Sequence, residues 1–257
     1  MNMHVVHDGS PHEPPLLLIH GSGASGASWA PIVPALAAHR HVIRVDLPGC
    51  GQSPPVGSAT VPEQAGRVAA LLDDLGLRRV AVAGHSSGGY VAVSLAEQRP
   101  DLVSRLALIS TGPSLDAFLP EPPVLKLLLG PPLGRMLWAL RSDAMIRRGI
   151  TATAARPVDI PAAWVADMHG LQYRTFRTIT RHATEFLRER AVPVRMKALD
   201  LKGLVIFGDA DPRWDPASAH DYESTAGVRV EMLAGVGHLP MLEAPGETSR
   251  LLLAGTA

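Results

Sequence analysis

The chain has 257 residues, with 24 Lys and Arg residues against 24 Asp and Glu residues and a single cysteine. This length suits one α/β domain with an insertion, and the balanced charge gives no electrostatic case for nucleic acid or a membrane surface as a partner. One cysteine excludes an intramolecular disulfide and is compatible with a reducing compartment. The N-terminal residues lack a signal-peptide pattern, and no apolar run approaches the length of a membrane span. We therefore expect a cytoplasmic protein. As a separate expectation, it is a monomer or homodimer whose partner is a small molecule.

Short apolar runs alternate with helical patterns through the first 110 residues. This alternation predicts β-α-β units and a mostly parallel sheet with helices on both faces, because strands buried on both sides are continuously apolar. In chain order the expected elements are a strand at Leu16–Ile19, a helix at Trp29–Ala38, a strand at Val42–Val45, a helix at Glu63–Leu75, a strand at Val80–Ala83, a helix at Tyr90–Gln98 and a strand at Leu106–Ile109. Before Leu16, only Met3–His7 is available to pair with the sheet.

The alternation stops after Ser110. Residues 113–202 begin with a proline-rich stretch and continue as helical patterns without a convincing strand. The regular pattern resumes with strands at Leu204–Phe207 and Val228–Leu233 and a closing helix from Glu243 to Leu253. We therefore assign residues 1–112 and 203–257 to an α/β core and residues 113–202 to a helical insertion.

The pentapeptide Gly84-His85-Ser86-Ser87-Gly88 stands between the strand ending at Ala83 and the following helix. A serine on a tight strand-to-helix turn has strained dihedrals, so its neighbours at minus two and plus two must be very small. The helix directs its positive N-terminus at this turn, which favours negative charge developing there. The pattern predicts a nucleophile at Ser86, whereas a Gly/Ser-rich loop is the alternative on composition alone.

Two other features have competing interpretations. Cys50 is a candidate catalytic thiol, but it lies in a Pro-Gly-Cys-Gly turn without a strand-to-helix elbow. The glycine-rich loop at residues 20–23 follows a strand, as phosphate-binding loops do, yet it lacks both Gly-x-Gly-x-x-Gly and a P-loop Lys-Ser/Thr pair. We expect neither a cofactor nor a metal.

Four landmarks together resemble the α/β-hydrolase superfamily over nearly the whole chain. They are His20-Gly21-Ser22-Gly23, the segment from Asp46 to Ser53, the turn at Ser86, and a tail with Gly208-Asp209-Ala210-Asp211 followed by Gly235-Val236-Gly237-His238-Leu239-Pro240. The resemblance implies the α/β-hydrolase fold, with the insertion forming a helical cap over the active site. The chain order Ser, Asp, His is the order that this fold uses.

A serine hydroxyl needs an adjacent base, and the base needs a carboxylate to fix its tautomer. His238 is the candidate base because it follows the last strand in a glycine-bracketed loop. The family spacing of Gly and Asp with a following proline selects Asp211 as the acid; Asp209 is expected to face a turn or solvent, and Asp215 is a further candidate.

The resemblance also assigns residues around the reacting serine. The oxyanion hole is expected from Ser87 and from Ser22, with Gly23 as the alternative, while Gly21 and Gly23 let their loop approach the substrate. Within the cap, Trp164, Met168 and Tyr173 either line an apolar pocket or form the cap's own core.

The cap carries an excess of positive charge. Between Pro113 and Leu199 there are 13 Lys and Arg residues against 7 Asp and Glu residues. Arg174, Arg177 and Arg181 share one helix face, which indicates either an anionic substrate or a solvated surface.

These residues support three functional hypotheses. The first is a serine hydrolase that cleaves an ester, lactone or thioester of a small to medium, largely apolar compound. The second is carbon–carbon bond hydrolysis, or lyase or cyclase activity, on the same triad; carbon–carbon hydrolases usually carry Trp after the catalytic histidine, where this chain has Leu239. The third is a non-catalytic receptor, which the filled triad disfavours. A serine nucleophile excludes the epoxide hydrolases and haloalkane dehalogenases, which use Asp.

Overall fold

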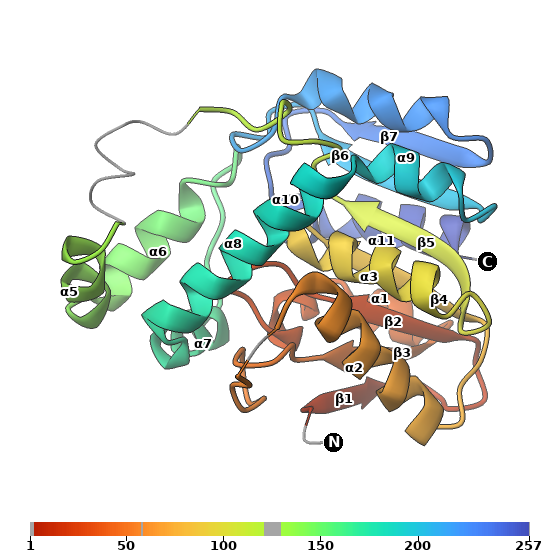
Figure 1. Ribbon diagram of the computed structural model, residues 1–257, viewed down its shortest axis with the longest axis horizontal. Coiled ribbons are helices and arrows are strands. Elements are labelled where there is room, and N and C mark those ends of the chain that lie inside the picture. Colours follow the sequence, from red (N-terminus) through yellow and green to blue (C-terminus); the bar gives the residue numbers. More distant parts are fainter. Residues whose placement is uncertain (1–2, 58, 121–129, 257) are drawn as a thin grey trace.

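A computed structural model describes residues 3–57, 59–120 and 130–256. Within them, seven strands form one sheet in the order β1-β3-β2-β4-β5-β6-β7, in which β1 is antiparallel to β3 and every other neighbouring pair is parallel (Figure 1). The strands are β1 (Val5–Asp8), β2 (Pro15–Ile19), β3 (His41–Val45), β4 (Val80–His85), β5 (Val103–Ile109), β6 (Gly203–Gly208) and β7 (Val228–Leu233). This sheet confirms the predicted fold class.

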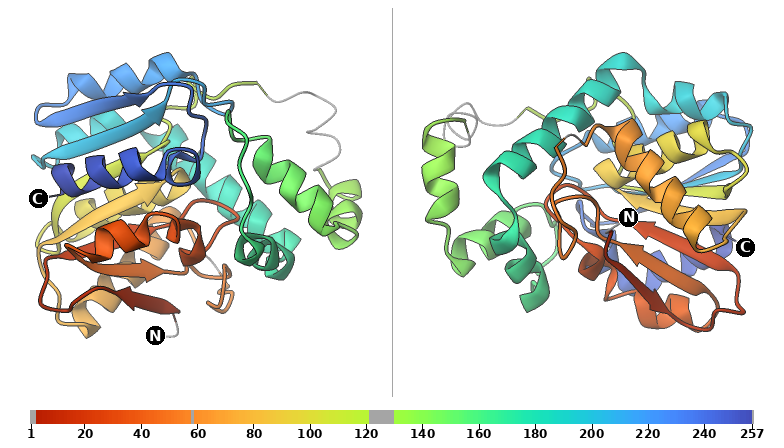
Figure 2. Two further views of the ribbon diagram at one scale, coloured as in Figure 1. Left: turned by 180° about the vertical axis from the view of Figure 1, so that it is seen from behind. Right: turned by 60° about the horizontal axis from the view of Figure 1, so that its bottom comes forward.

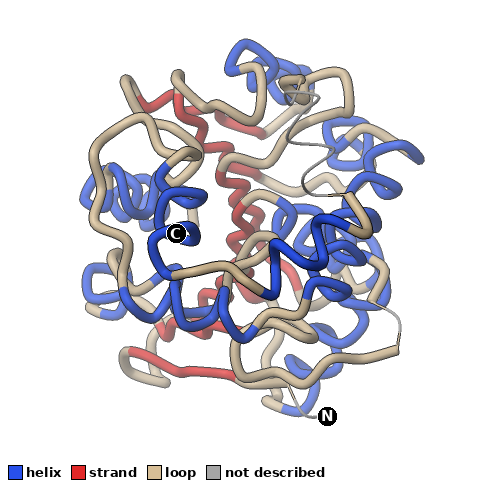
Figure 3. Tube along the Cα trace, turned by 90° about the vertical axis from the view of Figure 1, so that its left-hand side faces the viewer, coloured by secondary structure: helices blue, strands red, loops and turns tan. Residues whose placement is uncertain are grey.

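Helices cover both faces of the sheet, as the tube drawing of Figure 3 shows. Those of the core are η1 (Gly26–Trp29), α1 (Val33–Ala37), α2 (Val61–Asp74), α3 (Ser87–Gln98), η2 (Pro216–Ser224), α10 (Pro240–Glu243) and α11 (Pro245–Gly255). Helices α2 and α3 lie on one face, and α1 and α11 lie on the other, which is in front in the left view of Figure 2.

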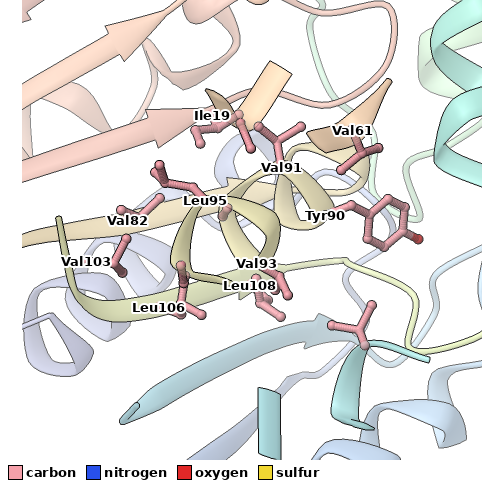
Figure 4. Close-up of a cluster of buried hydrophobic side chains, with 14 of the residues drawn as sticks. Ile19, Val61, Val82, Tyr90, Val91, Val93, Leu95, Val103, Leu106 and Leu108 are labelled. Carbon is pink, nitrogen blue, oxygen red and sulfur yellow. The ribbon is translucent and has the colours of Figure 1, made fainter. Parts of the chain in front are cut away.

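Strands β2 to β6 each contribute alternate side chains to two separate apolar cores. On the face of α3, Ile19 and Val82 of the sheet pack with Val91 and Leu95 of the helix (Figure 4). On the opposite face, Leu16 and its alternate neighbours pack against α1 and α11. Burial on both sides explains why the central strands are continuously apolar rather than alternating. Together the two cores hold the carboxyl ends of the strands in a fixed arrangement.

The segment between β5 and β6 carries five helices among its described residues: α5 (Leu133–Ala139), α6 (Asp143–Thr151), α7 (Ala162–Gly170), α8 (Tyr173–Glu189) and α9 (Val192–Lys197). Figure 1 shows α5, α6 and α7 to one side of the sheet, whereas α9 lies beside the core helices. Part of the proline-rich stretch expected to form turns, residues 121–129, lies outside the described residues. No described helix has the length and apolar character required to cross a membrane.

Two expected helices are each divided in the structure. Of the expected helix at Trp29–Ala38, only Val33–Ala37 is α-helical and Trp29 is the last residue of η1, because Pro31 has no amide hydrogen with which to continue the first turn. The expected helix from Glu243 to Leu253 is wrong at its start. Glu243 ends α10, and Ala244 adopts an extended φ of −142° before Pro245 begins α11, because a residue that precedes proline avoids the helical region.

Helix α2 begins with a reciprocal cap that offers a test of local stability. The Thr60 hydroxyl accepts a hydrogen bond from the Glu63 amide, and the Glu63 carboxylate accepts one from the Thr60 amide. We predict that Thr60→Ala lowers the free energy of unfolding by about 1 kcal/mol in urea denaturation, because the Glu63 amide loses its acceptor. Thr60→Ser keeps the oxygen and should remain within a few tenths of a kcal/mol of the wild type; an equal loss in both variants would contradict the cap.

Candidate active site

Ser86 lies on a strained turn between β4 and α3. Its backbone has φ 51° and ψ −123°, in a region that residues with side chains rarely adopt. A Cβ atom on Gly84 would lie 2.5 Å from the Gly88 carbonyl oxygen, and one on Gly88 would lie 2.4 Å from the Ile19 carbonyl oxygen. The two glycines are therefore required by close backbone approach, and the turn presents a half-buried Ser86 at the end of the sheet.

A hydrogen-bonded chain connects Ser86 to His238 and Asp211. The Ser86 hydroxyl lies 3.0 Å from Nε2 of His238, and Nδ1 of the same ring lies 2.8 Å from Oδ2 of Asp211. The side chains of His238 and Asp211 are only 6% and 0% exposed. Because the carboxylate only accepts hydrogen bonds, Nδ1 carries the proton in the neutral ring and Nε2 accepts from the serine.

The three candidate carboxylates have different partners. Asp211 uses its second oxygen to accept hydrogen bonds from the amides of Arg213 and Trp214, at 2.8 and 3.3 Å, which orients the group towards the imidazole. Asp209 is exposed and accepts from the Gly235 amide. Asp215 caps η2 by accepting from the Ala217 amide. The geometry thus places Asp211, and neither alternative, beside His238.

The loop at residues 20–23 lies directly beside the turn at Ser86. The hydroxyls of Ser22 and Ser87 are 2.8 Å apart, and Ser87 begins α3, so its amide belongs to the positive end of the helix. His20 holds the loop by donating from Nδ1 to the Gly21 carbonyl and accepting the Leu47 amide at Nε2. Burial lowers the pKa of His20, so the ring remains the neutral form that can make both bonds.

Among the predicted cap residues, Met168 lies nearest to this loop. A Cβ atom on Gly23, which has φ 79°, would be 3.2 Å from the Met168 sulfur and 3.6 Å from the Phe176 ring. Trp164 is 8% exposed and donates its indole N–H to the Ala27 carbonyl, so it joins α7 to the core. Tyr173 packs on Trp138, with ring centroids 5.9 Å apart. Contact of Trp164 or Tyr173 with a substrate stays a prediction.

Cys50, the alternative candidate nucleophile, lies in an apolar environment. Cys50 is buried beside Leu171 and Ile179, and burial raises the pKa of its thiol to about 12, so it stays protonated at neutral pH.

The arginines of α8 line an open surface hollow of about 1010 Å³. Its described lining comprises Pro131, Arg135, Gln172, Tyr173, Arg174, Arg177, Thr178, Thr180, Arg181, Thr184 and Arg188, without the residues around Ser86.

Two buried side chains at the site were not predicted from the sequence. His85 occupies the unrestricted position before Ser86, and it donates from Nε2 to the His238 carbonyl at 2.8 Å. The Glu243 carboxylate accepts hydrogen bonds from the amides of Gly237 and Leu239, on both sides of His238. The sequence signal for Glu243 was only its position five residues after the histidine, which by itself does not indicate a contact.

Comparison with known proteins identifies the family. Residues 16–251 match the model of the Alpha/beta hydrolase family. The chain belongs to this family. A solved membrane phospholipase A, described as a bacterial virulence factor, superposes with a TM-score of 0.76 at 27% identity, covering 99% of this chain and 83% of that one.

Curated relatives match only part of this α/β hydrolase. The 2-hydroxy-6-oxononadienedioate/2-hydroxy-6-oxononatrienedioate hydrolase of Cupriavidus pinatubonensis is 40% identical over 41% of this chain and 39% of its own length. The pimeloyl-[acyl-carrier protein] methyl ester esterase of Aeromonas hydrophila is 41% identical over 39% of each chain. The matched part spans about two fifths of these relatives.

The burial of His85 leads to a prediction about stability and pH. Burial, reinforced by the neighbouring His238, lowers the pKa of His85 to about 3, whereas the unfolded chain binds a proton near pH 6.5. Between these values the unfolded state holds more protons, so this term favours folding at neutral pH and is lost as the pH falls. We predict that His85→Gln reduces the difference in unfolding free energy between pH 7.5 and pH 5 by about 2 kcal/mol.

Urea denaturation of both proteins at the two pH values measures this difference. His12→Gln replaces an exposed histidine and is the matched control, for which the wild-type difference is expected. An unchanged pH dependence in His85→Gln would contradict a buried neutral imidazole at this position.

Proposed function

We propose that this α/β hydrolase is a serine hydrolase, which cleaves an ester, lactone or thioester of a small to medium, largely apolar compound through an acyl-enzyme on Ser86. The observation that carries the proposal is the hydrogen-bonded chain from Ser86 through His238 to Asp211. It has the connectivity that nucleophilic catalysis by serine requires. The relative named as a methyl ester esterase and the phospholipase A structure support ester cleavage.

Acylation follows from this geometry. The Ser86 oxygen attacks the substrate carbonyl while Nε2 of His238 takes the hydroxyl proton, and the Asp211 carboxylate stabilises the imidazolium. Collapse of the tetrahedral intermediate expels the alcohol or thiol, which receives that proton. Water then attacks the acyl-enzyme, gives its proton to Nε2, and releases the acid with the proton returned to Ser86.

The negative charge of the intermediate requires donors that are already in place. We assign this role to the backbone amides of Ser87 and Ser22, whose hydroxyls are 2.8 Å apart. The first amide lies at the positive end of α3. Gly21 supports a close approach, because a Cβ atom there would be only 3.1 Å from the Ser86 side chain.

The proposed substrate class rests on the apolar side chains beside the loop at residues 20–23. Met168 and Phe176 of the insertion face Gly23, so we propose that residues 113–202 act as a cap that presents apolar side chains to the acyl group. The arginines of α8 line a separate surface hollow, which favours the interpretation of a solvated helix face over an anionic pocket at Ser86.

The relative named as a 2-hydroxy-6-oxononadienedioate hydrolase favours one alternative function. On the same residues, a carbon–carbon bond hydrolase, lyase or cyclase would use His238 for proton transfer and the same amide donors. A vinylogous diketone acid that is turned over far faster than any ester would establish the alternative in place of ester cleavage.

The proposed nucleophile is tested by covalent labelling. We predict that a fluorophosphonate adds its mass to the peptide containing Ser86, because His238 activates this hydroxyl. Ser86→Ala should not be labelled, and Ser87→Ala, which keeps the nucleophile, should be labelled. Folded wild-type protein that remains unlabelled, or is labelled elsewhere, would contradict the proposal.

The proposed acid is tested by a matched pair of substitutions. Asp211→Asn should lower kcat for p-nitrophenyl esters on the order of 10³- to 10⁴-fold, because the amide favours the wrong tautomer of His238 and cannot offset the imidazolium charge. Asp209→Asn changes an exposed turn and should cost little. With circular dichroism showing that both variants are folded, the reverse ranking would transfer the role to Asp209.

A further inference from the structure

A buried carboxylate outside the proposed triad holds the loop that carries His238. Glu243 ends α10 and is 7% exposed. Its Oε2 accepts the Gly237 amide at 2.9 Å, and its Oε1 accepts the Leu239 amide at 3.0 Å. These amides belong to the residues directly before and after His238. One side chain therefore fixes the backbone on both sides of the imidazole.

The same carboxylate also holds the chain between α6 and α7. Oε2 of Glu243 accepts the amides of Ala155 and Arg156, at 2.8 and 3.0 Å. In return, the His238 amide donates to the Thr153 carbonyl at 2.8 Å. A Cβ atom on Gly237 would lie 2.5 Å from the Ala155 nitrogen, so the two segments are in direct backbone contact.

The exposed side chain of Arg156 adds a second set of bonds between these segments. Its guanidinium donates to the carbonyls of Ala234 and Gly235, at 2.7 and 3.0 Å, and to the Glu243 carbonyl at 3.1 Å. The loop before His238 is thus tied to the insertion by Arg156 and by Glu243 at once.

Four amide donors give both oxygens of this buried side chain hydrogen-bond partners, which a buried polar group requires. With all four bonds made, the loop has a single well-defined position. This matters because misplacing a catalytic group by about 1 Å costs on the order of 100-fold in rate. Among the described residues, the donors to the Glu243 carboxylate are all backbone amides, so its effect on Ser86 passes through His238.

We propose that Glu243 is a positioning residue that sets the place of the His238 imidazole and couples it to the helical insertion. The proposal rests on the proposed function for its kinetic consequence, but not for its structural one. Movement of residues 153–156, for instance when a substrate contacts the insertion, is transmitted to the proposed general base through the shared carboxylate.

Glu243→Gln tests the proposal with a nearly isosteric side chain. The amide group that replaces one oxygen meets an N–H donor in either orientation, so at least one of the four backbone amides loses its acceptor. We expect kcat for p-nitrophenyl esters and the rate of fluorophosphonate labelling to fall together by about 10- to 100-fold, with KM changed less than threefold. Glu247→Gln, an exposed glutamate on α11, is the matched control.

Thr60→Ala distinguishes a positioning role of Glu243 from an effect on stability alone. Thr60→Ala lowers stability far from the site and should keep the wild-type kcat. Glu243→Gln should have a reduced kcat even at temperatures where Glu243→Gln is fully folded. If Glu243→Gln does not fold, Arg156→Gln loosens the same junction from the exposed side and should lower kcat by about threefold or more. Folded Glu243→Gln with wild-type kcat and labelling rate would overturn the proposal.

Nuclear magnetic resonance makes the outcome independent of the substrate. The proton between Nδ1 of His238 and Asp211 should give a low-field signal that shifts or broadens in Glu243→Gln and is unchanged in Glu247→Gln. If the wild-type protein hydrolyses no substrate and the signal still changes in Glu243→Gln, the proposed function is refuted and the positioning role stands. An identical signal in Glu243→Gln would refute the positioning role.

Discussion

Close backbone contact around Ser86 is the constraint on which the rest of the site depends. The turn has a positive φ, and it exists because Gly84 and Gly88 allow β4, α3 and β2 to approach within distances that no side chain would permit. Backbone strain of this kind persists only where the surrounding structure over-determines it. Here the two apolar cores on either side of the sheet supply that support.

The remaining functional groups are arranged relative to this turn by the parallel sheet. Ser86, Asp211 and His238 follow β4, β6 and β7, and the carboxyl ends of parallel strands meet at one edge of a sheet. Two buried neutral histidines then hold the loops around Ser86 in place. His20 ties residues 20–23 to Leu47, and His85 ties the turn to the His238 carbonyl. The low pKa values of both rings follow from the same burial that makes these bonds persistent.

Elements that depend on residues close together in the chain can be predicted from the sequence. The apolar runs located the central strands, and the glycines at 84 and 88 located the strained turn, because each depends on residues close together in the chain. Asp211 was separated from Asp209 only through family spacing, and the structure supplies the physical distinction: Asp211 reaches His238, whereas Asp209 caps an exposed turn.

The roles of His85 and Glu243 could not be read from the sequence. Both act on backbone groups, and Glu243 collects amides from positions 155, 156, 237 and 239, which only the folded chain brings together. The expected helix from Glu243 to Leu253 takes no account of Pro245, which places the break at Ala244 and ends α10 at Glu243. Trp164 donates its indole N–H to the Ala27 carbonyl of the core, a contact that an aromatic residue in a cap does not indicate by itself, and its contact with a substrate stays a prediction.

We expect the geometry at Ser86 to produce a covalent acyl intermediate during turnover. Its most direct measurement is a rapid acid quench of the wild-type protein during turnover of a short p-nitrophenyl ester, followed by peptide mass spectrometry. We expect the acyl mass on the peptide that contains Ser86 and its loss in His238→Ala. Hydrolysis that proceeds without an acylated peptide, or with the acyl group on another residue, would contradict it.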